Sequence, residues 1–282
     1  MSGACAPPRL ALQPLRDMPH AVAACMHTVL TDIDDTLTTA GQLTAAAYAA
    51  LDALHRAGLR VIPVTGRPAG WCDHFARMWP VHGVIGENGA FYMWHDAASG
   101  KLRTRHLLDA TQRQASARRL AEVRELVLRE VPGCAVASDQ FCRLYDLAID
   151  FCEDVPPLPA AAVDRITALM QAAGMTAKVS SIHVNGWFGQ WNKLDTARLM
   201  LQERHGMNLD EEREHIVFAG DSPNDEPMFA YFPHAVGVAN VLDQRDRLQH
   251  LPAWITPSRA GAGFVELAQV LLAARPAQPP QP

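Results

Sequence analysis

The sequence has 282 residues, of which 49% are hydrophobic and 20% are charged, the composition of an ordinary globular protein with one large or two average domains. The net charge is −5 and no basic stripe is present, which argues against nucleic acid as a main partner. No apolar run approaches the roughly 18 residues of a membrane span, and the six cysteines include no C-x-x-C pair. We therefore expect a soluble, cytoplasmic protein with no membrane partner, and the sequence leaves its oligomeric state open.

Strands and helices alternate along the chain after a proline-rich N-terminal segment. Short apolar runs are typical of buried parallel strands, and apolar residues that recur every three or four positions predict the helices between them. The expected elements are a strand at 28–34, a helix after Thr44 that ends near Gly58, a strand at 59–65 that Pro63 weakens, a helix from Pro68 to about Trp79, and a strand at 81–85. This alternation is the opening of a doubly wound α/β domain.

The pattern changes between residues 91 and 187. Successive strands followed by strand-helix units predict a separate α+β domain inserted into the first. The expected elements are strands at 91–94, 101–106, 144–151 and 178–184, with helices around Leu120 and Ile166. From residue 192 the α/β alternation resumes, with helices at 194–204, 225–232 and 264–272 and strands at 216–219 and 235–238.

We therefore expect an α/β fold: a doubly wound, Rossmann-like core with a parallel sheet and an inserted α+β domain. The expected boundaries are an N-terminal extension at 1–25, a core formed by 26–90 and 188–274, the inserted domain at 91–187, and a loose tail at 275–282.

Two carboxylates, Asp32 and Asp34, follow the first strand of the core. In open α/β sheets, ligands bind beyond the carboxyl ends of the strands. Two carboxylates one residue apart would repel each other there unless a cation or a shared proton compensates. A hard divalent ion such as Mg²⁺, bound together with a substrate phosphate, meets this need. The alternative is an Asp-rich turn that caps the next helix.

Three further segments bring polar residues to the predicted core. Thr65 and Gly66 lie between a strand and a helix, where a hydroxyl and backbone N–H groups can hold a phosphate, although Thr-Gly alone is also an ordinary turn. The loop 220–225 adds Asp221, Asn224 and Asp225 after an apolar strand, and helix capping explains only part of that set. Lys193 opens a helix, where the helix dipole mildly opposes a cation, and a surface lysine is its plainer explanation.

Taken in this order, the four segments resemble the motifs of the haloacid dehalogenase (HAD) superfamily of phosphatases. Asp32-Ile33-Asp34 resembles the first motif, Thr65 the second, Lys193 the third, and Asp221 with Asp225 the fourth. The inserted domain is similar to the large α+β cap of the subfamily that includes sucrose-phosphate and mannosyl-phosphoglycerate phosphatases. Glu87-Asn88-Gly89-Ala90 resembles the turn before that cap. Asp35, where the commonest pattern has glycine, and Pro223 depart from the motifs and bear on the conformation of their loops.

The resemblance implies a Mg²⁺-dependent phosphatase that hydrolyses a small phosphorylated molecule. By this resemblance, Asp32 is the nucleophile that forms an aspartyl-phosphate, and Asp34 is the general acid and base. The Asp32 carboxylate, the Asp34 carbonyl and Asp221 would bind Mg²⁺. Asn224 and Asp225 would orient the metal ligands, and Thr65, Gly66 and Lys193 would hold the phosphoryl oxygens.

The cap would recognise the leaving group, and a sugar phosphate is the substrate class that the resemblance favours. On the last expected cap strand, His183 and Asn185 lie on a polar face that also includes Ser181. Trp187 could stack on a sugar ring, and Asn88 lies in the turn before the cap. A polar face turned to solvent, with Trp187 packed at a hinge, explains the same pattern.

Three other functions remain open at this stage. One is a phosphosugar mutase of the same superfamily, and another is a phosphoacceptor signalling protein without turnover. The third is a sugar-phosphate binder without catalysis, which the full acidic set disfavours because uncompensated buried carboxylates are costly. We also expect the cap to move on hinges near Gly89 and Gly189.

Overall fold

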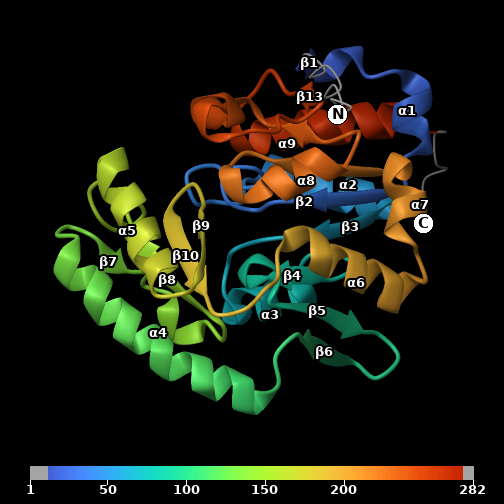
Figure 1. Ribbon diagram of the computed structural model, residues 1–282. Helices are drawn as coiled ribbons and strands as arrows, with labels where there is room; N and C mark the ends of the chain where they lie inside the picture. Colours follow the sequence, from blue (N-terminus) through green and yellow to red (C-terminus); the bar gives the residue numbers. More distant parts are fainter. Residues whose placement is uncertain (1–11, 276–282) are drawn as a thin grey trace, which may run out of the picture.

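A single parallel sheet forms the centre of the computed structural model, which describes residues 12–275 (Figure 1). The first 11 residues of the expected extension and residues 276–282 of the expected tail lie outside the described residues. The six strands run in the order β1 (Gln13–Pro14), β13 (Trp254–Ile255), β12 (Val236–Gly237), β11 (Ile216–Gly220), β2 (Thr28–Thr31) and β3 (Arg60–Pro63), and every pairing is parallel.

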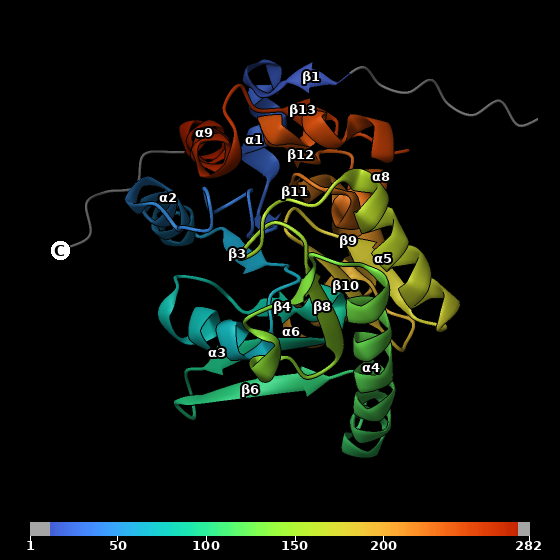
Figure 2. The same cartoon turned by 90° about the vertical axis from the view of Figure 1, so that its left-hand side faces the viewer.

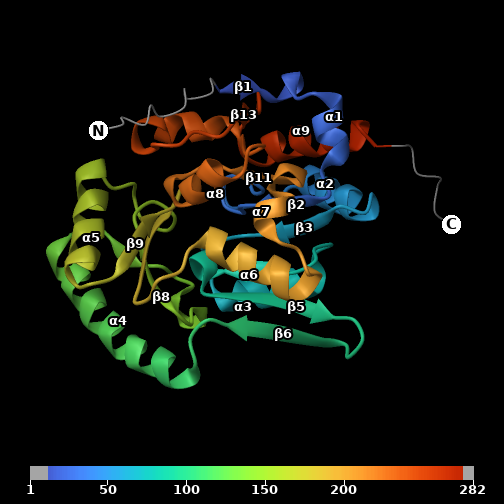
Figure 3. The same cartoon turned by 45° about the vertical axis from the view of Figure 1, so that its right-hand side comes forward.

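Helices cover both faces of this sheet. Short helix α1 (His20–Cys25) packs with α2 (Ala45–Arg56) and α9 (Ala260–Ala273) on one face. The other face packs against α6 (Lys193–His205), α7 (Leu209–Glu212) and α8 (Glu226–Tyr231), which lie in front of the sheet in Figure 3. Covering on both faces explains why β2 and β11 are buried at every residue and why neither contains a charged residue. The expected doubly wound core is confirmed.

Two sequence signals act as expected at the start of this core. The Oγ1 atom of Thr44 accepts the N–H of Ala47 at 3.2 Å and caps α2. Pro63 remains within β3, because β3 is the last strand of its sheet and the lost N–H costs least at an edge. Residues 12–25 also join the core, since β1 pairs with β13 and Leu15 is buried among the side chains around α9.

The third core strand, expected at 81–85, pairs mainly with the hairpin that follows it in the chain. Strand β4 (Val84–Gly86) is joined to the parallel sheet by the single bridge Val64↔Ile85, and it pairs antiparallel with β5 (Phe91–Asp96), which pairs with β6 (Lys101–His106). Three residues with positive φ, at 87 to 89, reverse the chain between β4 and β5. This small sheet packs against α3 (Ala69–Met78) on the core side (Figure 3). We therefore propose that the cap begins after residue 106.

A second antiparallel sheet forms the cap over the core. Its order is β7 (Ala135–Val136), β8 (Asp146–Asp150), β10 (His183–Trp187) and β9 (Thr176–Val179). Helices α4 (Ala110–Glu130) and α5 (Ala160–Ala172) pack on one face of it, and Figure 2 views the molecule from the cap side. The single strand expected at 178–184 is wrong: the chain forms β9 and β10, because Ser180 turns it back by donating its N–H to His183 O at 2.8 Å. Among the described residues, we find no helix with the length and apolar character needed to cross a bilayer.

Candidate active site

The carboxyl ends of β2 and β11 bring two acidic loops side by side. Thr31 and Ala219 are partners in the parallel register, so the next residue of each strand enters the same edge. The N–H of Asp32 donates to the carbonyl of Ala219 at 2.8 Å, which fixes Asp32 against the strand that leads to Asp221. Both carboxylates are almost fully buried. Residues 189 positions apart in the sequence are therefore neighbours in the fold.

Lys193 links two of the buried carboxylates. It is the first residue of α6, a helix that begins here because the side chain of Asn192 accepts the N–H of Asp195. Its Nζ donates to Asp32 Oδ1 and to Asp225 Oδ1, each at 2.6 Å. Burial opposes the charged ammonium, but the two carboxylates outweigh burial and hold the pKa of Lys193 above its ordinary value. The lysine expected to bind phosphate thus lies beside the expected nucleophile.

Neutral donors hold Asp221. Its Oδ1 accepts the hydroxyl of Thr36 at 3.1 Å, and its Oδ2 accepts the amide of Asn240 at 2.9 Å. Burial and the neighbouring carboxylates of Asp32 and Asp225 raise the pKa of Asp221 well above its usual range. Burial raises the pKa of Asp32 as well, although Lys193 partly opposes it. Both carboxyl groups therefore need additional positive charge to be ionised.

The acidic cluster fits a divalent cation. Oxygen atoms of Asp32, Asp221 and Asp225 lie within 4.8 Å of one another. Lys193 is the cationic partner that the structure describes for them, so three carboxylates and one ammonium leave two formal negative charges in a buried site. All-oxygen donors suit a hard ion such as Mg²⁺.

Asp225 differs from the other two carboxylates because both of its oxygens are already bonded. Oδ1 accepts from Lys193, and Oδ2 accepts the backbone N–H groups of Asp221 at 3.0 Å and Ser222 at 3.2 Å. This arrangement holds the acidic loop in place, as expected of a residue that orients the metal ligands. Asn224 accepts the hydroxyl of Ser222 at 2.7 Å and donates to Asn88 Oδ1 at 3.2 Å.

The Thr65–Gly66 segment lies on the neighbouring strand connection. Thr65 is fully buried, and its Oγ1 accepts the N–H of Arg67 at 3.0 Å. A Cβ at Gly66 would lie 3.2 Å from Asn88 Nδ2 and 3.6 Å from Asn185 Oδ1, so glycine lets the core and cap approach closely. Asn88 is buried, its Nδ2 has no hydrogen-bond partner among residues 12–275, and its φ of 55° requires a residue that tolerates the left-handed region.

Arg67 joins the expected general acid to the cap. Its Nε donates to both oxygens of Asp34, at 2.9 and 3.1 Å, and its Nη2 forms an ion pair with Glu153 of the cap at 2.8 Å. The imidazole Nε2 of His183 lies 2.9 Å from the other oxygen of Glu153. A chain of alternating charges therefore runs from the core carboxylate across the domain boundary.

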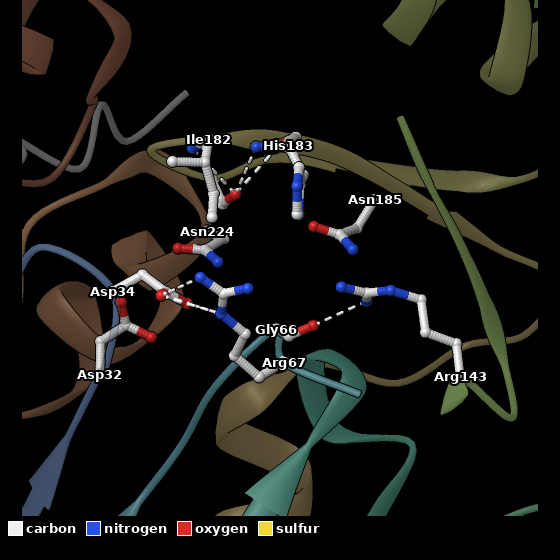
Figure 4. Close-up of a pocket in the computed structure, with 10 residues that line it drawn as sticks. Asp32, Asp34, Gly66, Arg67, Arg143, Ile182, His183, Asn185 and Asn224 are labelled. Carbon is white, nitrogen blue, oxygen red and sulfur yellow. Dashed lines mark hydrogen bonds and ion pairs between the residues drawn. The ribbon is translucent and has the colours of Figure 1, made fainter. Parts of the chain in front are cut away.

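The polar face of the cap sheet is turned toward this site. His183 and Asn185 are buried and line a cavity together with core residues (Figure 4). Asn185 donates to Asp146 of β8 at 2.8 Å. Trp187 does not line the cavity: it is buried against Trp191, with 6.0 Å between the ring centroids. The structure therefore places the two polar residues at the site and Trp187 in an apolar cluster.

A second arginine closes the cavity from the cap. Arg143 donates to the carbonyl of Gly66 at 2.9 Å and pairs with Asp146 at 3.0 Å and Asp139 at 3.1 Å. The cavity has a volume of about 10 Å³, enough for about one water molecule. The cap is therefore closed over the acidic cluster.

Several residues of this site carry no local sequence signal. The sequence indicates Arg67 only as a neighbour of the Thr-Gly turn, and the other partners lie in loops far along the chain. These residues are Arg67, Asp139, Arg143, Asp146, Glu153 and Asn240. By contrast, the structure explains why the commonest motif pattern has glycine where this chain has Asp35. The φ of Asp35 is 53°, a left-handed conformation that glycine adopts without cost and Asp tolerates.

Comparisons with known proteins agree with this architecture. Residues 29–125 match the family model of haloacid dehalogenase-like hydrolases. The fold is similar to the C-terminal domain of trehalose-6-phosphate phosphatase from C. albicans (TM-score 0.68, 13% identity, 94% of this chain and 99% of that one). It is also similar to the sucrose-phosphatase of Synechocystis (TM-score 0.58, 15% identity, 86% of this chain and 97% of that one). A protein from Thermoplasma acidophilum is similar as well (TM-score 0.66, 16% identity, 87% of this chain and 98% of that one). No curated protein sequence matches the chain significantly.

Proposed function

We propose that the chain is a Mg²⁺-dependent phosphatase of the haloacid dehalogenase-like hydrolases, whose family model matches residues 29–125, and that it hydrolyses a sugar phosphate. The observation that carries the proposal is the buried constellation of Asp32, Asp221 and Asp225 around Lys193. A site with two excess negative charges has no structural benefit without a cation. The cation, in turn, would attract a phosphate.

The reaction proceeds in two displacements. The carboxylate of Asp32 attacks phosphorus, the bond from phosphorus to the leaving oxygen breaks, and Asp34 supplies the proton that makes this oxygen an alcohol. Water then attacks the phosphorus of the aspartyl-phosphate, Asp34 takes a proton from this water, the bond from phosphorus to the Asp32 oxygen breaks, and inorganic phosphate leaves. Two easier steps thereby replace one difficult step, and Asp34 contributes by general acid and base catalysis.

The remaining residues bind and orient. Asp32, the Asp34 carbonyl and Asp221 would hold Mg²⁺, which when bound neutralises charge on the phosphoryl oxygens. Lys193, which lies 2.6 Å from Asp32, and the N–H groups around Thr65 and Gly66 would hold the phosphoryl group.

The charges around the cavity favour an uncharged leaving group. Arg67 and Arg143 face the cavity, but four carboxylates, those of Asp34, Asp139, Asp146 and Glu153, already pair with them. A second anionic group on the substrate would compete with these pairs. Amide and imidazole groups of Asn185 and His183 suit the hydroxyl groups of a hexose or disaccharide, which both donate and accept hydrogen bonds.

The cap must move during turnover. A cavity of about 10 Å³ cannot admit a sugar phosphate, so entry requires the cap to separate from the core and to break the ion pair between Arg67 and Glu153. Closure would then exclude water from the reacting groups. Crystals with a bound substrate analogue should differ from the closed form in the angle between cap and core, and an identical angle would contradict this step.

The decisive experiment measures phosphate release from a panel of phosphate esters, with Mg²⁺ and with EDTA. Release should require Mg²⁺ and favour hexose or disaccharide phosphates over esters whose leaving group carries a carboxylate. Asp32→Asn should abolish release, and Asp34→Asn should lower kcat by about 10²- to 10⁴-fold. Asp52→Asn, a change at a half-exposed residue of α2 that pairs with Arg56 outside the site, is the matched control. Transfer of phosphate to a second hydroxyl instead of to water would identify a mutase.

A further inference from the structure

A second group of metal-binding side chains lies at the opposite end of the same two strands. His27 directly precedes β2, and His215 directly precedes β11. The N–H of His27 donates to the carbonyl of His215 at 3.0 Å, so the parallel register sets the two residues side by side. Their imidazole rings stack with centroids 5.7 Å apart. Adjacent parallel strands therefore hold two nitrogen ligands on one face of the sheet.

A carboxylate completes the group. Glu212, the last residue of α7, directs Oε2 to within 3.0 Å of His27 Nε2 and 3.4 Å of His215 Nδ1. One oxygen therefore faces two ring nitrogens, and the three ligand atoms all lie within 4.8 Å of one another. A metal ion is small enough to contact all three after minor side-chain rotation, because zinc–nitrogen and zinc–oxygen bonds are about 2.0–2.2 Å long.

Two independent observations favour a ligand between these side chains. The Nδ1 atom of His215 is buried and has no hydrogen-bond partner in the part of the chain that the structure describes. On the other ring, Nδ1 of His27 lies 2.9 Å from the hydroxyl oxygen of Thr28. When Nδ1–H donates to this oxygen, the lone pair of Nε2 points to Glu212, and such an outer partner is typical of metal-bound histidine.

We propose that His27, Glu212 and His215 form a zinc site that fastens the amino ends of β2 and β11 to α7. The donor set of two imidazoles and one carboxylate selects a borderline ion such as Zn²⁺ and disfavours Mg²⁺. The active site, with its oxygen donors, has the reverse preference. The two sites lie roughly 16 Å apart along β2, given about 3.3 Å per residue from His27 to Asp32. Figure 1 shows α7 on the side of the core away from the cap.

The role of this site is structural. Each side chain is about two-fifths exposed, so solvent can fill the remaining coordination positions. The bound ion would hold together the starts of the two strands whose other ends carry Asp32 and Asp221, and it would thereby stabilise the folded chain. It takes no part in the hydrolysis.

The test is a titration of the metal-free full-length chain with Zn²⁺ in saturating Mg²⁺, which keeps the active site filled. Calorimetry should give one Zn²⁺ per chain for the unaltered protein. His27→Gln, His215→Ala and Glu212→Gln should each weaken binding by at least about tenfold. His55→Gln is the matched control, because His55 also lies beside a second imidazole, that of His82, with ring centroids 4.9 Å apart.

Two further measurements make the result specific. Co²⁺ in place of Zn²⁺ should give the visible absorption of a nitrogen-ligated ion, and His215→Ala should remove it. Zn²⁺ should raise the midpoint of thermal unfolding of the unaltered chain but not of the variants. Phosphate release with Mg²⁺ should persist in every variant, and it also reports that each one is folded. Absence of a Zn²⁺ equivalent in saturating Mg²⁺, or equal Zn²⁺ affinity in all three variants and the unaltered chain, would overturn the proposal.

Discussion

At the scale of single residues, the charge balance of the active site depends on Lys193. Its ammonium is the bonded cation between Asp32 and Asp225, and all three groups are buried. Lys193→Met would leave two buried carboxylates without this partner, and the free energy of unfolding in EDTA should fall by about 3–5 kcal/mol. Denaturant titration measures this change.

A double variant separates charge from packing in that experiment. Asp225→Asn removes one of the uncompensated charges, so Lys193→Met with Asp225→Asn should recover part of the loss. If the double variant loses as much free energy of unfolding as the two single variants lose together, the charge explanation is wrong.

Asn240 tests the idea that neutral donors orient the metal ligand. Its Nδ2 donates to Asp221 Oδ2 at 2.9 Å and to the carbonyl of Asp35 at 3.0 Å. Asn240→Ala should raise the Mg²⁺ concentration for half-maximal activity by about 10- to 100-fold, with little change in kcat at saturating Mg²⁺. Asn208→Ala, at the exposed start of α7, is the control and should leave the Mg²⁺ requirement unchanged.

The sequence predicted which polar residues gather at the ends of the parallel strands. Asp32, Thr65 and Asp221 each follow an apolar run, and parallel strands necessarily bring their carboxyl ends to one edge. Arg67, Glu153 and Asn240 could not be predicted in this way. Their partners lie on other loops, and the distances between loops depend on how the cap packs on the core, which local patterns do not encode.

At the scale of elements, one buried carboxylate fastens the cap to the core. Glu87, in the turn between β4 and β5, accepts backbone N–H groups from both sides. They come from Ala69 at the start of α3 and from Leu144, Tyr145 and Asp146 at the start of β8, at distances of 2.6–3.2 Å. Four donors converge on one carboxylate, so the position requires an acceptor with no hydrogen of its own.

Glu87→Gln keeps the size of this side chain but presents an NH₂ group to N–H donors. At least one buried donor loses its acceptor, and the free energy of unfolding should fall by about 1–3 kcal/mol. Glu226→Gln is the matched control, since Glu226 accepts two backbone N–H groups, those of Gln249 and His250, at a partly exposed position. An equal, small effect in both variants would show that the buried clamp contributes nothing.

Elements were predicted best where one signal dominates. Apolar runs and the Thr44 cap predicted β2, β11 and α2 because burial and capping are local requirements. The prediction of a single strand at 178–184 was wrong because the alternation of polar and apolar residues in β10 also continues through the turn at Ser180. The partner of the 91–106 hairpin was not predictable, because strand alternation contains no information on which sheet a hairpin joins.

At the scale of the whole molecule, the sheet separates two chemically different ends. Its carboxyl end gathers carboxylates beneath the cap, and its amino end gathers imidazoles around β2, β3 and β11. The fold class followed from the order of elements, and residues 29–125 match the model of the family that the motifs resemble. The closed position of the cap rests on ion pairs between distant segments, and no local pattern predicts it.

The imidazoles near the amino end also predict how stability depends on pH. Burial, together with the neighbouring His55 and Arg60, lowers the pKa of His82 to about 4, and burial beside Arg60 lowers that of His205 to about 4 as well. His82 Nδ1 accepts the N–H of Val61 at 3.2 Å, which requires an unprotonated nitrogen. In the unfolded chain both histidines bind a proton near pH 6.5.

Between pH 6.5 and about 4 these two imidazoles bind more protons in the unfolded chain than in the folded chain, so their contribution to stability must fall as the pH falls through this window. The free energy of unfolding, measured by denaturant titration at several pH values, should have a slope against pH that His82→Gln lowers by up to one proton. His250→Gln, at an exposed position, should leave the slope unchanged. An unaltered slope in His82→Gln would mean that this imidazole takes up its proton without unfolding, and the neutral hydrogen bond to β3 would then not contribute to stability.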